Sequence, residues 1–215
     1  MARGRLITIE GLDGAGKSTL TAGLQRELFE RGLAVRALRE PGGVELAERI
    51  RAVVKDPALR VGARAEALLY AAARAQLVAE GVAPLLDSGH WVLLDRFVDS
   101  SLAYQGAGRG LGIDPVRAIN DFATGGLRPD RTLLLDVEPA VGRSRQAGRA
   151  EAPDRLERES ERFFAAIAGA YERLAAEDPQ RVRTIDAGGP PEAVLAHALA
   201  ALGDLLDEAG APRTL

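Results

Sequence analysis

The most informative stretch of the chain is Gly11-Leu12-Asp13-Gly14-Ala15-Gly16-Lys17-Ser18, which fits the pattern G-x-x-x-x-G-K-[ST]. Glycines in this pattern let the backbone bend so that its N–H groups face phosphate oxygens, and the helix that follows adds its N-terminal positive charge. Lys17 can reach the outer phosphates, and the Ser18 hydroxyl can join a Mg²⁺ shell. The alternative is a strand–helix turn that binds nothing. The predicted ATP phosphate-binding residues are Gly11, Leu12, Asp13, Gly14, Ala15, Gly16, Lys17, Ser18 and Thr19.

The elements around this loop favour phosphate binding. Residues 6–9 form an apolar run typical of a buried strand, and Leu20, Leu24 and Leu28 recur at helical spacing. Strands and helices alternate along the rest of the chain, which predicts an α/β fold with a five-stranded parallel sheet and helices on both faces. The further strands are expected at 34–39, 90–94, 132–137 and 182–185, and the further helices at 45–55, 63–86, 115–124, 160–177 and 191–208.

Charged residues follow several of these strands. Asp95 comes directly after the apolar strand 90–94, where an acid can orient Mg²⁺ or its waters beside a phosphate loop. Its alternative role is a helix cap or a turn. Asp136 is a second candidate for the metal, ranked lower because Arg96 adds a cation next to Asp95. Arg39 and Glu40 lie at another strand's carboxyl end, where α/β sheets bind ligands.

Two segments carry groups suited to a small polar ligand. Tyr70 and Arg74 are four residues apart on a predicted helix and therefore share one face, although such a pair commonly combines packing with a solvated charge. Residues 100–105 offer hydroxyls and an amide in a row, which suit either ligand binding or a capped helix start. From 143 to 158 five arginines interrupt a helical pattern, which indicates either a solvated face or a mobile basic lid.

Composition narrows the class of protein. The chain has 215 residues, 47% apolar residues, a net charge of −3 and no cysteine. Its charge offers no global attraction to nucleic acid or to an anionic membrane. No apolar run is long enough to span a bilayer, and the N-terminus runs directly into the first strand. We expect a cytoplasmic protein with one domain over 1–215 that binds neither nucleic acid nor membrane.

Four stretches together resemble thymidylate kinases of the bacterial type. They are the phosphate loop with Asp13 inside it, Arg39-Glu40-Pro41-Gly42-Gly43, the run from Asp95 to Gln105, and Asp154-Arg155-Leu156-Glu157. The resemblance extends nearly end to end, and the third stretch is specific to this family. It implies a three-layer P-loop NTPase fold with a small arginine-rich lid at about 143–157. It also implies a homodimer that transfers the γ-phosphate of ATP to dTMP, giving dTDP, with Mg²⁺.

The resemblance also implies roles for individual residues. Asp13 would bind the sugar 3′-hydroxyl, and Arg39 and Arg96 the acceptor phosphate. Tyr70 would stack on the thymine, and Arg74, Ser101 and Gln105 would contact its edge. Tyr104 would pack by the deoxyribose, and Arg51 and Glu40 would border the same pocket. The implied dTMP-binding set is Asp13, Arg39, Glu40, Arg51, Tyr70, Arg74, Arg96, Ser100, Ser101, Tyr104 and Gln105.

Phosphoryl transfer needs alignment and charge neutralisation rather than a covalent intermediate, and no nucleophile–base pair is visible in the sequence. The expected catalytic residues are Lys17, Arg96, Asp95 and Arg149, with Ser18 and Asp95 at the metal. The resemblance also implies a comparison within the family, one branch of which has an arginine in the phosphate loop where this chain has Gly14. Glycine supplies no charge, so another cation must neutralise the charge that develops on the transferred phosphoryl group. The candidates are the lid residues Arg143, Arg145 and Arg149, of which Arg149 is ranked first.

Rival functions meet specific difficulties. Another P-loop nucleoside or nucleotide kinase would keep the first third of the chain but lose the 100–105 stretch. A GTPase needs an N-K-x-D sequence, whereas the only asparagine, Asn120, is followed by Asp121. A nucleic-acid motor would need a longer chain and a basic tract.

Overall fold

The computed structural model describes residues 3–138, 141–142, 144–145 and 154–210. Within them a five-stranded parallel sheet has the strand order β2-β3-β1-β4-β5. The strands are β1 (Leu6–Gly11), β2 (Val35–Arg39), β3 (Trp91–Asp95), β4 (Arg131–Asp136) and β5 (Val182–Asp186). Ile9 is in register with Asp95, and Gly11 with Leu135, so the carboxyl ends of the central strands meet at one edge. The predicted α/β class and parallel sheet are confirmed.

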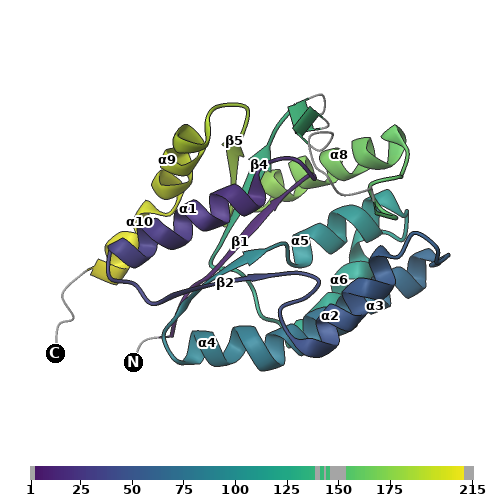
Figure 1. Cartoon of the computed structure of the whole chain (residues 1–215), viewed down its shortest axis with the longest axis horizontal. Helices are drawn as coiled ribbons and strands as arrows, with labels where there is room; N and C mark the ends of the chain where they lie inside the picture. The colour runs from purple at the N-terminus through teal and green to yellow at the C-terminus, as the bar shows by residue number, and fades with distance from the viewer. Residues whose placement is uncertain (1–2, 139–140, 143, 146–153, 211–215) are drawn as a thin grey trace.

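Alternation along the strands divides the core into two layers, because successive side chains point to opposite faces. Ile7 and Ile9 pack in one layer with α1 (Lys17–Glu30), α9 (Pro191–Ala201) and α10 (Gly203–Gly210). Leu6 packs in the other layer, which the remaining helices cover (Figure 1). These are α2 (Glu45–Lys55), α3 (Ala63–Leu77), α4 (Ala83–Asp87), α5 (Val98–Ser101), α6 (Ile113–Thr124) and α8 (Glu161–Glu177).

The prediction of one helix over 63–86 is wrong in detail. A π-helical stretch, η1 (Val78–Val82), separates α3 from α4, and Pro84 at the start of α4 has no N–H to continue an α-helical ladder. The predicted helix over 191–208 is also two helices. It breaks at Leu202, whose N–H donates to Leu199 O at the shorter three-residue spacing of a tight turn.

The 100–105 stretch lies on α5 and on a second π-helical segment, η2 (Leu102–Gly108). π-helical turns displace side chains relative to an α-helix and occur frequently at functional sites. Of the predicted lid, residues 144, 145 and 154–157 are described, whereas Arg143 and Arg149 lie outside the described residues. No helix in the described part of the chain has the length and apolar character needed to cross a membrane.

Candidate active site

A cavity of about 270 Å³ contains most of the residues singled out by sequence. It is lined by residues from the phosphate loop, from β2 and β3, from α3 and from the α5–η2 segment, so the parallel topology brings distant segments together. All of the implied dTMP-binding residues line it, and so do Lys17, Ser18, Thr19 and Asp95. Further lining residues are Gly14, Gly16, Pro41, Lys55, Asp154, Leu156 and Glu157. Gly11, Leu12 and Ala15 form the loop without lining the cavity.

The phosphate loop has the backbone shape that its glycines permit. Gly16 precedes α1 with φ of 98°, a left-handed conformation that favours glycine. A Cβ at Gly14 would overlap the backbone oxygen of Gly142, so a larger residue there requires the 141–142 segment to move. Lys17 is the first residue of α1 and only 7% exposed. Its Nζ donates to Gly11 O at 3.1 Å and to Leu12 O at 2.9 Å.

Burial of Lys17, together with the nearby guanidinium of Arg96, lowers its pKa to about 8. The carboxylates of Asp13 and Asp95 oppose this shift by favouring the charged ammonium. Lys17 is therefore mostly protonated at neutral pH, and bound phosphates would favour the ammonium further.

Ser18 and Asp95, the two residues predicted to bind Mg²⁺, lie close together. Ser18 Oγ lies 3.5 Å from Asp95 Oδ2, at the junction of the phosphate loop and the end of β3. Both atoms are hard oxygen donors of the kind that Mg²⁺ accepts, and the residues therefore fit such an ion. No group of three or more His, Cys, Asp or Glu side chains that could hold a metal ion occurs in the described ranges. Asp136, the lower-ranked candidate, is exposed and does not line the cavity.

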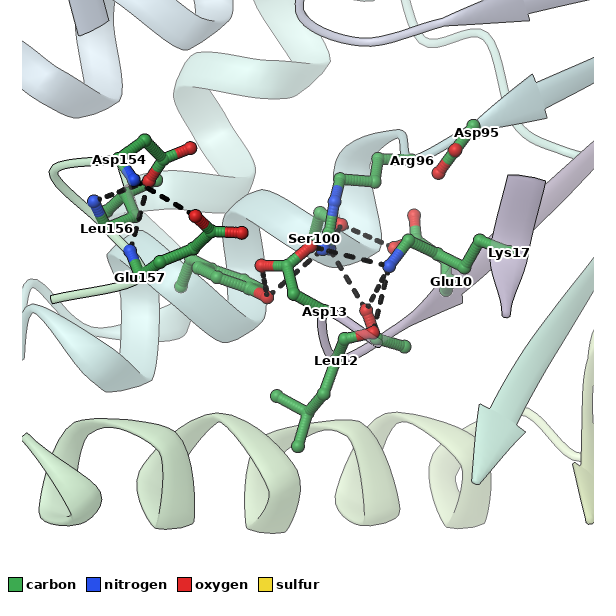
Figure 2. Close-up of polar contacts among 12 residues, drawn as sticks. Glu10, Leu12, Asp13, Lys17, Asp95, Arg96, Ser100, Asp154, Leu156 and Glu157 are labelled. Carbon is green, nitrogen blue, oxygen red and sulfur yellow. Dashed lines mark hydrogen bonds and ion pairs between the residues drawn. The ribbon is translucent and has the colours of Figure 1, made fainter. Parts of the chain in front are cut away.

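Arg96 is at the centre of the polar contacts in Figure 2. Its Nη2 donates to Asp13 Oδ1 at 2.7 Å and to Tyr104 OH at 3.2 Å, and its guanidinium carbon lies 5.0 Å from the centre of the Tyr104 ring. Burial opposes ionisation of Asp13, but Arg96 and Lys17 hold the pKa of this carboxyl well below its usual value. The phosphate loop and Arg96, which follows β3, are thus joined by a partly buried ion pair.

Glu10 is a residue of the site that sequence reasoning missed. It is fully buried at the end of β1, and its carboxylate accepts hydrogen bonds from Phe97 N at 2.7 Å, from Ser100 Oγ at 2.5 Å and from Tyr171 OH at 3.0 Å. Ser100 Oγ in turn accepts from Arg96 Nη1 at 3.1 Å (Figure 2). Arg96 has φ of 70°, a strained value for a residue with a side chain, and these bonds support that turn. The sequence feature that could have identified Glu10 is an acidic residue within an otherwise apolar strand.

Arg74 is buried rather than solvated, with 1% of its surface exposed. Its Nε and Nη2 both contact Glu40 Oε2, at 2.7 and 2.5 Å, while Nη1 donates to Ser101 Oγ at 2.9 Å and to Asn120 Oδ1. Nη2 also donates to Phe97 O at 2.9 Å, so each guanidinium N–H has a protein acceptor. Burial raises the pKa of Glu40 to about 7 although Arg74 opposes the shift. Asn120, which the sequence analysis mentions only because it is not part of an N-K-x-D sequence, thus accepts a hydrogen bond from Arg74.

Of the remaining arginines predicted to belong to the site, Arg39 and Arg51 line the cavity and Arg145 does not. Arg39 is more than half exposed and pairs with Glu48 at 2.9 Å, so it is available at the mouth of the cavity. Arg51 Nη1 donates to Pro41 O at 2.9 Å. Arg145 Nη1 donates to Ala187 O at 3.0 Å, after β5, and Arg145 does not line the cavity.

The 154–157 stretch forms a turn that Asp154 organises. Asp154 Oδ1 accepts from the N–H groups of Leu156 and Glu157 at 2.9 and 3.0 Å, and Glu157 Oε2 accepts from Asp154 N at 3.0 Å. This reciprocal pattern is that of a capping box. Lys55 Nζ binds Asp154 Oδ2 at 2.9 Å, which ties the turn to the end of α2.

Comparison with known proteins agrees with this geometry. Residues 9–198 match the family model described as thymidylate kinase. The chain is 48% identical over 213 residues to a thymidylate kinase of Halorhodospira halophila, covering 98% of this chain and 99% of that protein. It is 47% identical over 204 residues to one of Deinococcus radiodurans, covering 95% and 98%. It is 45% identical over 205 residues to one of Bacillus pumilus, covering 94% and 97%. This chain therefore belongs to the thymidylate kinase family.

Proposed function

We propose that this chain transfers the γ-phosphate of ATP to dTMP, giving ADP and dTDP for the supply of dTTP. The observation that carries this conclusion is one cavity in which the phosphate loop, Arg96 and the base-side residues Tyr70, Arg74 and Gln105 meet. With the donor phosphates on the loop and the acceptor nucleotide in the same cavity, an oxygen of the acceptor phosphate lies next to the γ-phosphorus that it attacks, and ADP leaves. Alignment of this kind accounts for much of phosphoryl-transfer catalysis.

The proposed division of roles follows the positions of the charges. Lys17 and the N-terminus of α1 bind the donor phosphates, while Arg96 and Arg39 bind the acceptor phosphate. Ser18 and Asp95 would hold Mg²⁺ through their oxygen atoms. When bound, the ion neutralises charge on the donor phosphates and orients them. Asp13 keeps Arg96 aligned between the two substrates through the ion pair at 2.7 Å.

A coupled assay tests this function directly. ATP is offered with dTMP, dUMP, dCMP or dGMP, and formation of ADP is measured for each. We expect the highest kcat/KM with dTMP. A higher value with a purine nucleotide or with dCMP would favour the alternative, another P-loop nucleoside monophosphate kinase. The Ser100–Gln105 stretch argues against that alternative, because its sequence resembles that of thymidylate kinases in particular and four of its residues, Ser100, Ser101, Tyr104 and Gln105, line the cavity.

We further propose that a lid arginine supplies the cation that the phosphate loop lacks at Gly14. Arg149→Ala should lower kcat about 100-fold or more, because a contact made chiefly in the transition state is lost. KM for dTMP should change little, since Arg39 and Arg96 hold that phosphate. Steady-state kinetics of Arg143→Ala, Arg145→Ala and Arg149→Ala provide the comparison. Near wild-type rates for all three would show that the basic segment does not take part.

The protein is also proposed to act as a homodimer. Large apolar side chains are exposed on three helices of one layer, with α3 packed between α2 and α6 (Figure 1). Phe122 on α6 is 92% exposed, Leu68 on α3 is 56% exposed, and Leu46 and Val53 on α2 are 47% and 42% exposed. Such a group of apolar side chains is typical of a surface that a partner covers.

Phe122→Asp should raise the dimer dissociation constant at least about tenfold, because a buried interface aromatic commonly contributes a large share of the binding energy. Sedimentation or light scattering at several concentrations measures the change. Phe29→Asp is the matched control, since Phe29 is 72% exposed but lies on α1 in the opposite layer. A wild-type monomer at high concentration, or equal effects of both substitutions, would contradict the proposed interface.

The proposed cellular setting follows from the substrates. ATP and dTMP are cytoplasmic metabolites, so we propose a cytoplasmic enzyme that acts as one kinase unit over 1–215.

A further inference from the structure

Glu66 is a fully buried acid on α3, one helical turn before Tyr70, and it does not line the cavity. Its carboxylate accepts hydrogen bonds from three side chains. Gln105 Nε2 lies at 2.9 Å, Arg109 Nη2 at 3.0 Å and Arg155 Nη1 at 2.7 Å. Burial alone would raise the pKa of Glu66, but the hydrogen bonds from Arg109, Gln105 and Arg155 lower it. Glu66 is therefore ionised and acts only as a hydrogen-bond acceptor.

An acceptor at this position determines which way the Gln105 amide points. A glutamine amide has a donating NH₂ end and an accepting oxygen end, and only the NH₂ end can face a carboxylate. The oxygen end is then directed away from Glu66. Gln105 is 2% exposed and lines the cavity with Tyr70 and Arg74. In the described part of the chain no group donates to Gln105 Oε1, so this atom is available to accept from a ligand.

Ser101 lies one turn before Gln105 and presents the opposite polarity. Its Oγ accepts from Arg74 Nη1 at 2.9 Å, and no acceptor for its hydroxyl proton is found among the described residues. The proton is thus available to a ligand carbonyl. A donor beside an acceptor matches the edge of an imide base, in which a carbonyl lies next to a ring N–H. Thymine and uracil have this edge. Cytosine has instead a ring nitrogen without hydrogen, beside an amino group.

We propose that Glu66 is a positioning residue for base selectivity, which holds Gln105 with its carbonyl oxygen toward the base and so selects a ring N–H. The inference rests on the proposed function, because it names how the acceptor pocket distinguishes pyrimidines. A cytosine ring nitrogen would face the Gln105 oxygen, and two acceptors in contact leave a buried group unsatisfied. A site built to accept a hydrogen bond discriminates strongly against a ligand without the donor.

The isosteric substitution Glu66→Gln tests the role of the carboxylate. A carboxamide at position 66 can donate as well as accept, so Gln105 is free to turn its NH₂ end toward the base. The ratio of kcat/KM for dTMP to that for dCMP should fall about tenfold or more, mainly through the two KM values. Because both substrates are measured on one preparation, the ratio does not depend on the fraction of folded enzyme. An unchanged ratio would overturn the proposal.

Glu159→Gln is the matched control. Glu159 accepts from Arg109 Nη1 at 2.5 Å, so its substitution removes another carboxylate from the same ion-pair network but leaves the Glu66–Gln105 bond intact. The selectivity ratio of this variant should stay within about twofold of wild type. A matching loss of selectivity in both variants would assign the effect to the network in general and overturn the specific role of Glu66.

A second measurement uses the wild-type protein and is independent of whether the Glu66→Gln protein folds. The probe is a dTMP analogue in which carbon replaces the ring nitrogen at position 3, so that a C–H faces Gln105. The neighbouring oxygen is then a hydroxyl, which can still accept from Ser101. Its inhibition constant should exceed the KM of dTMP by about tenfold or more. Equal values would show that no acceptor meets the N–H, which also overturns the proposal. If wild-type enzyme does not phosphorylate dTMP at all, the proposed function fails instead.

Discussion

Lys17→Ala should reduce kcat by about 100- to 1,000-fold while the protein stays folded. In the free protein the Lys17 ammonium binds Gly11 O and Leu12 O, and it lies 3.7 Å from Asp13 Oδ1. Donor phosphates placed on the loop would accept from the same ammonium. Loss of one such buried transition-state contact costs roughly 3–4 kcal/mol. Retention of more than a tenth of wild-type kcat would contradict the assignment of the loop.

The control for this variant is Thr21→Ala. Thr21 lies one turn further along α1, is buried, and donates to Lys17 O at 2.9 Å. Its removal takes one buried hydrogen bond from the same helix without removing charge, so turnover should stay within about threefold of wild type. Thermal unfolding should show both variants to be folded. A large loss of turnover in Thr21→Ala would mean that damage to α1, not loss of the ammonium, explains the result.

The pKa of Lys17 adds a second readout. A lysine must be protonated to bind phosphate, and the pKa of about 8 in the free protein places its loss of charge just above neutral pH. Since kcat/KM reports ionisations of the free enzyme, kcat/KM for ATP should decline above about pH 8. Lys17→Arg should lack this decline at the same pH, because a guanidinium stays charged.

Arg96→Met should lower kcat/KM for dTMP by about 1,000-fold, with KM for ATP changed no more than about threefold. The partly buried guanidinium contacts Gly11 O, Asp13, Ser100 and Tyr104, and we propose that it is the cation between the loop and the acceptor nucleotide. The substitution removes a forked cationic donor and leaves the Asp13 carboxylate, with only the Lys17 ammonium at 3.7 Å beside it, to repel the acceptor phosphate. A loss smaller than about tenfold would contradict the proposed role.

Two further variants separate charge from geometry and from stability. Arg96→Lys keeps the charge but loses the planar fork, so kcat/KM should recover only in part. Arg5→Met removes another ion pair, Arg5 Nη1 to Asp130 Oδ1 at 2.8 Å, next to β1 at the opposite edge of the sheet. It should leave kcat/KM for dTMP unchanged. If Arg5→Met and Arg96→Met lost activity to the same extent, reduced stability would explain both.

Much of the site was predictable because its residues occur in local patterns with a direct chemical meaning. The loop from Gly11 to Ser18 needs only its own glycines and the adjoining strand and helix to form a phosphate cradle. Asp95 follows an apolar strand, and parallel strands place their carboxyl ends at one edge. The position of the cavity and most of its lining could therefore be predicted from the order of the motifs along the chain.

Departures from the predicted elements arise where tertiary contacts override local periodicity. Apolar residues continue at helical spacing through 63–86 and 191–208, so the sequence predicts unbroken helices there. In the structure Leu77, Val82 and Leu86 are all buried in one cluster, and the π-helical stretch between α3 and α4 lets the chain keep them there despite Pro84. Leu202, at the break between α9 and α10, and Leu205, on α10, are both buried on the opposite face of the sheet.

The amino-acid sequence alone was enough to recognise the phosphate loop, and it predicts a metal site at Ser18 and Asp95 and a set of cations for the acceptor phosphate. The pairing of the buried polar groups, by contrast, became visible only in the three-dimensional structure. Glu10 meets Tyr171 across 161 positions of the chain, and Glu66 meets Gln105 across 39. No local pattern specifies such partners, because an acid inside a strand or helix is equally compatible with solvent, a cap or a cation. Folding resolves the choice, since a buried carboxylate is stable only where donors from other elements reach it.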